Sequence, residues 1–183
     1  MLDISFGAFP ELKTNRLVLR QMLDSDAEAL FKFRSDPRVM RYFGRPLMQV
    51  VAEAEKFVTE IQGMFDRNEG VQWAIFLLDD PQMIGSITIW KIDKTNHRGE
   101  IGYMLGPDFQ GTGLMTEAIH AMLAYAFGTL HLHSLEANVN PDNAASIKLL
   151  ERNGFVREAY FRENFYFEGN FEDSAIYSLI SPS

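Results

Sequence analysis

The stretch Leu105-Gly106-Pro107-Asp108-Phe109-Gln110-Gly111-Thr112-Gly113-Leu114-Met115-Thr116-Glu117-Ala118 joins a predicted strand, 99–105, to a predicted helix, 114–130. Its two central glycines lack a Cβ, which lets the backbone turn sharply and approach a ligand closely. The first N–H groups of a helix have no partner within the helix and point out of its N-terminus. The loop therefore suits an anion such as a phosphate without any cationic side chain.

Two familiar phosphate-binding loops do not fit this stretch. The dinucleotide fingerprint needs a third small residue where Thr116 stands, within an early strand–helix–strand unit that the chain lacks. The P-loop pattern needs a lysine, and the chain has none between Lys94 and Lys148. On the loop alone, a pyrophosphate site and a tight turn followed by a helix cap remain equally open.

Outward from the loop, the hydrophobic pattern predicts a mixed sheet covered by helices, an α+β fold. The predicted strands span residues 16–20, 71–78, 83–92, 99–105, 134–139, 155–161 and 172–179. Helices are expected from Asp24, as an N-cap, to Arg34, and over residues 39–43, 50–67, 114–130 and 144–152. No repeat or linker interrupts this order, so we expect one domain over residues 1–183.

Composition excludes several classes of protein. The chain has 183 residues, 17 basic and 25 acidic side chains, a net charge of −8 and no cysteine. Disulfides, cysteine-bound zinc and a thiol nucleophile are therefore impossible. The negative charge argues against a nucleic-acid partner. Residues 1–10 lack an export signal and no apolar run could span a membrane, so we expect a cytoplasmic protein without a membrane partner.

The loop resembles a family motif. Gln110-Gly111-Thr112-Gly113-Leu114-Met115 resembles the Gln/Arg-x-x-Gly-x-Gly/Ala motif of the GNAT superfamily of acyl-CoA N-acetyltransferases. Met115 departs from the Gly/Ala of that motif. Glu100-Ile101-Gly102-Tyr103-Met104-Leu105 and Gly111-x-Gly113-x-Met115-Thr116-Glu117-Ala118 resemble the ribosomal-protein N-terminal acetyltransferase branch, the RimJ/RimL type.

Further motifs of that branch follow in the right order and extend the resemblance over about residues 12–180. They are Thr14-x-Arg16-Leu17-x-Leu19-Arg20, Asn138-x-Asn140-x-x-Asn143-x-x-Ser146, Glu151-x-x-Gly154-Phe155 and Asp173-x-x-x-Tyr177-Ser178-Leu179. The resemblance implies a GNAT-type fold. In that fold a twisted, mostly antiparallel sheet of about seven strands is splayed in the middle and flanked by four to five helices.

The resemblance also implies acetyl-CoA as the co-substrate. Its pyrophosphate would bind the loop amides, and its pantetheine arm would run beside the preceding strand as a neighbouring strand does. The implied coenzyme-binding residues are Met104, Leu105, Gln110, Gly111, Thr112, Gly113, Leu114, Met115, Thr116, Asn138, Asn143 and Ser146. No metal is expected, because His131 and His133 have no third ligand placed by the sequence.

Acetyl transfer to an amine needs a neutral nucleophile, a stabilised oxyanion and a proton for the leaving thiolate. Without cysteine, direct attack in a ternary complex is the natural route. Glu100 is the candidate general base, against the alternative of a strand-end carboxylate paired with Arg98. Family members often carry a tyrosine where Leu150 stands. Ser146, one turn earlier, is the candidate proton donor, against a role as a helix cap. The Leu105 amide is the candidate oxyanion donor.

The sequence contains fewer motifs that point to the acceptor-binding residues. Residues 1–91 carry 11 basic and 13 acidic side chains, and residues 92–183 carry 6 and 12, so the half around the donor site suits a cationic amine. Tyr42, Phe43, Trp90 and Tyr160 are candidate acceptor-binding residues, although aromatic side chains more often serve packing. The expected function is transfer to a protein N-terminal amine by a monomer or homodimer. A small-amine acetyltransferase and a non-catalytic acyl-CoA-binding module are the alternatives.

Overall fold

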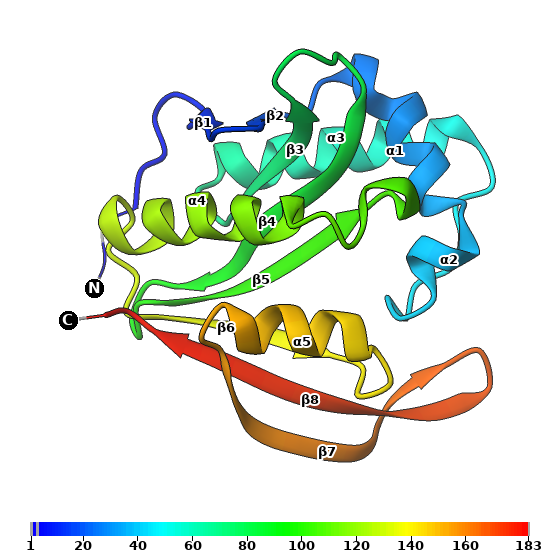
Figure 1. Ribbon diagram of the computed structural model, residues 1–183, viewed down its shortest axis with the longest axis vertical. Helices are drawn as coiled ribbons and strands as arrows, with labels where there is room; N and C mark the ends of the chain where they lie inside the picture. Colours follow the sequence, from blue (N-terminus) through cyan, green and yellow to red (C-terminus); the bar gives the residue numbers. More distant parts are fainter. Residues whose placement is uncertain (1, 3, 183) are drawn as a thin grey trace.

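The computed structural model describes residue 2 and residues 4–182 (Figure 1). Among these residues, eight strands form one sheet in the order β1-β2-β3-β4-β5-β6-β8-β7, in which only β5 and β6 pair in parallel. The strands are β1 (Leu12–Lys13), β2 (Leu17–Gln21), β3 (Val71–Leu77), β4 (Met83–Asp93), β5 (Arg98–Leu105), β6 (Ser134–Val139), β7 (Val156–Phe167) and β8 (Asn170–Ile180).

Helices cover both faces of this sheet. They are α1 (Ala27–Arg34), α2 (Pro37–Met40), α3 (Val51–Asp66), α4 (Leu114–Gly128) and α5 (Ala144–Arg152), with short 3-10 turns at Asp24–Asp26 and Pro107–Phe109. Figure 1 shows α4 and α5 on the near face and α1 and α3 behind the sheet. Within the described residues, no helix is both long and apolar enough to cross a membrane.

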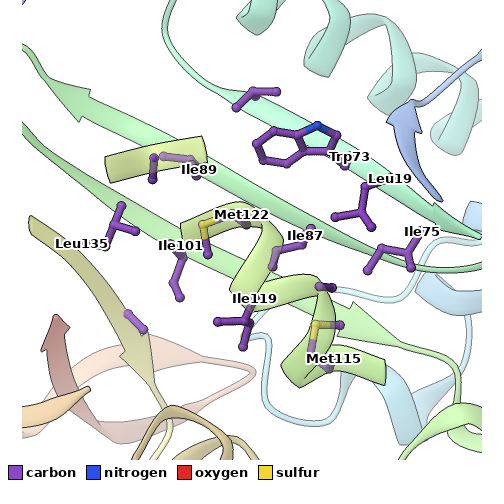
Figure 2. Close-up of a cluster of buried hydrophobic side chains, with 14 of the residues drawn as sticks. Leu19, Trp73, Ile75, Ile87, Ile89, Ile101, Met115, Ile119, Met122 and Leu135 are labelled. Carbon is purple, nitrogen blue, oxygen red and sulfur yellow. The ribbon is translucent and has the colours of Figure 1, made fainter. Parts of the chain in front are cut away.

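Alternation along the strands divides the core between the two faces. Trp73, Ile87 and Ile101 point toward α4, where Ile119 and Met122 are fully buried against them (Figure 2). On the other face, Ala74 and Phe76 of β3 and Met83 of β4 form a second cluster with α1 and α3. Because α4 contributes so many buried side chains, its N-terminus is held firmly at one edge of the central strands.

The sheet splits between β5 and β6. Their parallel register covers only Arg98 to Glu100 on β5, opposite Ser134 to Glu136 on β6. Beyond this point β5 stays paired with β4 as far as Leu105, and β6 stays paired with β8 as far as Val139. A gap therefore opens between the two strands and leads toward the glycine-bearing loop, as the splayed sheet of the sequence prediction requires.

The predicted fold class is confirmed, and four details differ. The helix expected over residues 39–43 is found at Pro37–Met40, because the Asp36 carboxylate caps it by accepting from the Arg38 amide at 2.8 Å. The two-residue strand β1 adds an eighth strand to the expected seven. The last two strands extend to Phe167 and begin again at Asn170, so they form a longer hairpin than predicted. Asp24 does not cap α1, since it begins a 3-10 turn whose Asp26 carboxylate accepts from the Leu23 amide at 2.8 Å.

Candidate functional site

The loop after β5 has the conformation that its glycines suggest. Gly111 and Gly113 have φ angles of 75° and 80°, which favour glycine, and Gly113 is the N-cap residue of α4. Residues 111–113 are exposed, whereas Leu114 and Met115, which begin α4, are buried. The loop thus presents unpaired N–H groups at a helix N-terminus, an arrangement that favours anions.

Side chains of the loop hold its shape from within. The Gln110 amide donates to the Leu105 carbonyl at 2.9 Å, and the Thr112 hydroxyl donates to the Phe109 carbonyl at 2.6 Å. Met115, which departs from the family motif, is 7% exposed and packs in the core beside Ile119 (Figure 2). Its bulk is therefore accommodated in the core, and the exposed part of the loop keeps its two glycines.

The strand before the loop presents its backbone to the gap. Met104 and Leu105 are almost fully buried. The Gly106 amide donates to the Ile84 carbonyl of β4 at 2.9 Å. Because backbone groups alternate in direction along an antiparallel ladder, the Leu105 amide points away from β4, toward the gap. A ligand in the gap could therefore accept a hydrogen bond from this amide, as a neighbouring strand would.

Ser146 is joined to the opposite side of the gap. Its Oγ lies 2.7 Å from the hydroxyl of Tyr103, a β5 residue that the sequence analysis did not single out. Burial raises the pKa of Tyr103 to about 12, although the Ser146 contact opposes the shift. Tyr103 therefore keeps its hydroxyl proton at neutral pH, and either hydroxyl can be the donor in this contact. Its alternation with Ile101 and Leu105 was the available sequence signal, because all three share one face of β5.

The two asparagines predicted to bind the coenzyme both precede α5. Asn143 is the N-cap residue, and its side-chain oxygen accepts from the Ser146 amide at 3.1 Å. The cap of α5 is therefore Asn143 and not Ser146, whose backbone amide is the donor and whose hydroxyl contacts Tyr103. Asn138 is exposed on β6, on the far side of the gap from Met104. Leu150, where family members often carry tyrosine, is fully buried.

Glu100 lies at the point where the sheet divides. It is the last β5 residue in register with β6, it is 9% exposed, and its carboxylate accepts from the Lys91 ammonium at 2.7 Å. Glu100 is thus salt-bridged, as the alternative to the base role supposes, but its partner is Lys91 and not Arg98, which bonds to Glu136 on β6. The pairing of β4 with β5 shifts register after Trp90, and Lys91, which lies in the shifted segment, has a φ of 47°.

The predicted acceptor residues fall in three places. Trp90 is opposite Glu100 on β4, with the Lys91 ammonium 4.3 Å from its ring centroid. Tyr42 and Phe43 precede Gly44, where an added Cβ would lie 2.3 Å from the Phe165 ring of the β7–β8 hairpin. Tyr160, on that hairpin, donates to Asp173. The segment after α2 and the hairpin therefore meet, whereas Trp90 is associated with the base of the gap.

A hollow of about 400 Å³ lies beside Trp90 at the end of α3. Its charged lining residues are Arg67, Glu69, Lys91 and Lys94. This predominantly cationic lining does not suit a cationic amine. In the described part of the chain, no three His, Asp or Glu side chains are grouped so that they could hold a metal ion.

Comparisons with known proteins agree with this architecture. The family model described as "Acetyltransferase (GNAT) domain" matches residues 16–156. The uncharacterized N-acetyltransferase YoaA of Bacillus subtilis is 34% identical over 95% of this chain and 98% of its own length. The [ribosomal protein uS5]-alanine N-acetyltransferase of Escherichia coli is 30% identical over 93% and 91%. The spermidine N(1)-acetyltransferase of Vibrio cholerae is 25% identical over 87% and 90%.

A solved structure supports the same assignment. The GNAT-family acetyltransferase from Bacillus anthracis superposes with a TM-score of 0.84 at 26% identity, covering 93% of this chain and 98% of that one. The relatives are named as enzymes, which excludes the non-catalytic acyl-CoA-binding module among the sequence alternatives. With the split sheet and the glycine loop in place, the chain belongs to the GNAT family of acetyltransferases and is an N-acetyltransferase.

Proposed function

We propose that this enzyme transfers the acetyl group of acetyl-CoA directly to the α-amino group of a protein N-terminus. The observation that carries the proposal is the gap between β5 and β6, which has Glu100 at its base and the glycine loop at its open end. A coenzyme whose pyrophosphate binds the amides of residues 111–115 can extend its pantetheine arm along Met104 and Leu105. Its thioester would then lie deeper in the gap than Leu105, between Ser146 and Glu100.

In the proposed reaction the acceptor nitrogen attacks the thioester carbonyl carbon, and the carbon–sulfur bond breaks. Glu100 takes the proton that the nitrogen loses, directly or through water. The Leu105 amide, five residues and about 16 Å along the strand from Glu100, is too far from this base to bind the oxyanion and would bind the pantetheine arm instead. The CoA thiolate takes a proton from the Ser146 hydroxyl, which then regains one from solvent. No covalent enzyme intermediate is needed.

The β7–β8 hairpin supports a cationic acceptor. Asp173 accepts from the Tyr160 hydroxyl and from the Glu163 amide, and these bonds hold the pKa of Asp173 below its usual range. Its carboxylate thus remains charged at neutral pH beside Tyr160, one of the predicted acceptor contacts. The same anionic surface favours one alternative, a small polycationic amine as in the Vibrio cholerae spermidine relative.

Thiol release from acetyl-CoA over a panel of acceptors tests the proposal. We expect release with peptides that begin with Ala or Ser, and none with the same peptides acetylated at their N-termini. Release with spermidine, aminoglycosides or amino acids alone would replace the proposal with the small-amine alternative. No release with any acceptor, from enzyme that binds CoA, would refute both.

Replacing Glu100 with glutamine is expected to lower kcat/KM most at acidic pH. An α-amino group has a pKa of roughly 8, so at lower pH most of the acceptor carries a proton that a base must remove. At higher pH the free amine needs little help, and the variant should approach the wild type. Glu136→Gln is the matched control, since it removes the neighbouring carboxylate across the register. An unchanged pH–rate profile for Glu100→Gln would exclude this role.

Replacing Ser146 with alanine is expected to lower kcat by roughly 10²-fold, the lower end of general acid–base contributions, with little change in KM for acetyl-CoA. Tyr103→Phe should cause a smaller loss, and the double variant should match Ser146→Ala, because Tyr103 contacts the reaction only through Ser146. Ser174→Ala, which removes a remote buried hydroxyl, is the control. Equal kcat values for wild type and Ser146→Ala would contradict the assignment.

A further inference from the structure

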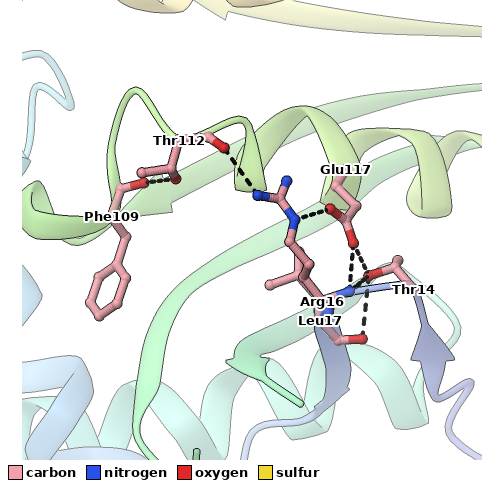
Figure 3. A network of polar contacts seen from close by, with 6 residues as sticks. All are labelled: Thr14, Arg16, Leu17, Phe109, Thr112 and Glu117. Carbon is pink, nitrogen blue, oxygen red and sulfur yellow. Dashed lines mark hydrogen bonds and ion pairs between the residues drawn. The ribbon is translucent and has the colours of Figure 1, made fainter. Parts of the chain in front are cut away.

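The Thr14-x-Arg16 motif, which the proposed reaction does not use, is joined to the coenzyme helix (Figure 3). The Arg16 guanidinium donates through Nε to Oε2 of Glu117, in the first turn of α4, at 2.7 Å. The Glu117 Oε1 atom accepts from the Arg16 main-chain amide at 2.9 Å and from the Thr14 hydroxyl. A segment next to β2 thereby holds the start of a helix about a hundred residues later.

Arg16 also binds the loop itself. Its Nη1 donates to the main-chain carbonyl of Thr112 at 3.1 Å, and its Nη2 lies 3.6 Å from where a Cβ on Gly113 would be. The carbonyl and the N–H of one trans peptide point in opposite directions. Holding the Thr112 carbonyl toward Arg16 therefore directs the Gly113 N–H to the other side of the loop, away from the guanidinium.

The same contacts control charge beside an anion site. A carboxylate next to bound phosphates would repel them, and Glu117 lies one turn into α4. Burial opposes its ionisation, but the bonds from Thr14 and Arg16 outweigh burial and hold the pKa of Glu117 below its usual range. Glu117 is thus an anion at neutral pH, and Arg16 is its counter-charge. Without Arg16, the helix N-terminus would carry an uncompensated negative charge.

We propose that Arg16 is a positioning residue for the coenzyme, which fixes the Thr112–Gly113 peptide and compensates the charge of Glu117. The proposal rests on the proposed function, because it requires that the loop bind the pyrophosphate of CoA. Arg16 acts through the loop and not on the reacting atoms. Its loss should therefore affect the binding of the coenzyme and spare the chemical step.

The test compares CoA affinity, measured by calorimetry, with steady-state kinetics for Arg16→Ala and Arg16→Lys. Bonds to charged groups are strong enough that we expect Arg16→Ala to raise the CoA Kd and the acetyl-CoA KM about tenfold. The acceptor KM and kcat at saturating acetyl-CoA should stay within about twofold of wild type. Arg16→Lys keeps the charge but lacks the planar fork, so its affinity should be only partly restored.

Arg20 supplies the matched control within the same motif. It lies on β2 and pairs with Asp26 through two bonds of 2.8 and 3.0 Å, and both partners are more buried than Arg16 and Glu117. Arg20→Ala should therefore lower Tm more than Arg16→Ala, yet leave the CoA Kd unchanged. An unchanged CoA Kd for Arg16→Ala, or CoA affinities that follow Tm across both variants, would overturn the proposal. A wild-type enzyme that does not bind CoA would refute the proposed function first.

Discussion

Replacing Gly113 with valine is expected to weaken CoA binding about tenfold or more. Holding a β-branched residue at positive φ costs on the order of 1–3 kcal/mol of backbone strain, so the loop would change its conformation. Gly113 has a φ of 80° and caps α4. Valine would leave this region, rotate the adjoining peptides and turn the first helix amides away from the ligand. Its branches would also extend from the Cβ position toward the Arg16 guanidinium, 3.6 Å away.

Gly169→Val is the matched control for this result. Gly169 has a φ of 88° at the turn between β7 and β8, with open space around an added Cβ. Both variants should lose stability through the same backbone strain, but only Gly113→Val should raise the CoA Kd, measured by calorimetry. If the two variants bound CoA equally well, the loop amides would not be the pyrophosphate site.

Replacing Trp73 with alanine is expected to remove about 3–5 kcal/mol from the free energy of unfolding, the usual cost of deleting a buried aromatic side chain. Trp73 is fully buried in the core (Figure 2). It meets the Tyr125 ring edge-on at 5.5 Å and donates through its indole nitrogen to the Pro10 carbonyl at 2.6 Å. Since whole domains are stable by about 5–15 kcal/mol, this single loss is a large fraction of the total.

Urea unfolding followed by circular dichroism measures this effect. Trp73→Phe keeps most of the ring volume and loses the hydrogen bond, so its cost should fall well below that of alanine. Trp90→Ala is the control, because Trp90, the second of two tryptophans, is only partly buried. Equal losses for Trp73→Ala and Trp90→Ala would contradict the assignment of Trp73 to the core.

Local signals in the sequence predict the centre of the fold well. The helix after the loop begins at Leu114, and the helix expected over residues 50–67 is found at Val51–Asp66. In both segments, apolar spacing agrees with the face that is buried. Asp24 was misjudged as an N-cap because the Asp26 carboxylate, two residues later, makes the bonds to Leu23 and Arg20.

The β7–β8 hairpin shows where hydrophobic periodicity loses its information. Most residues of β7 are exposed, so no buried face imposes an alternating pattern, and the predicted strand ends at Phe161 where the pairing becomes irregular. The chain resumes pairing at Phe165 and continues to Phe167. A strand that does not contribute to the core leaves little trace of its length in the sequence.

Cross-strand partners were the other part of the site that sequence reasoning could not reach. Glu100 bonds to Lys91 and not to Arg98, because the pairing depends on the register shift that follows Trp90. Glu117 bonds to Arg16, although a hundred residues separate them. Such pairs follow from which strands and helices become neighbours. A single sequence marks the residues, but it does not state their partners.

The short register between β5 and β6 also affects how the molecule opens. Strands β1–β5 and β6–β8 are two sheet halves that pair at three register positions, with further backbone bonds from the His133 and Ser134 amides to the His97 carbonyl. Local unfolding starts where few bonds must break, so we expect the two halves to separate first at this junction. A ligand that binds only the native state adds about 2.7 kcal/mol to the free energy of unfolding when its concentration is a hundred times its Kd. Acetyl-CoA bound along the junction would therefore hold the two halves together, and the enzyme with acetyl-CoA bound should resist proteolysis longer than the free enzyme.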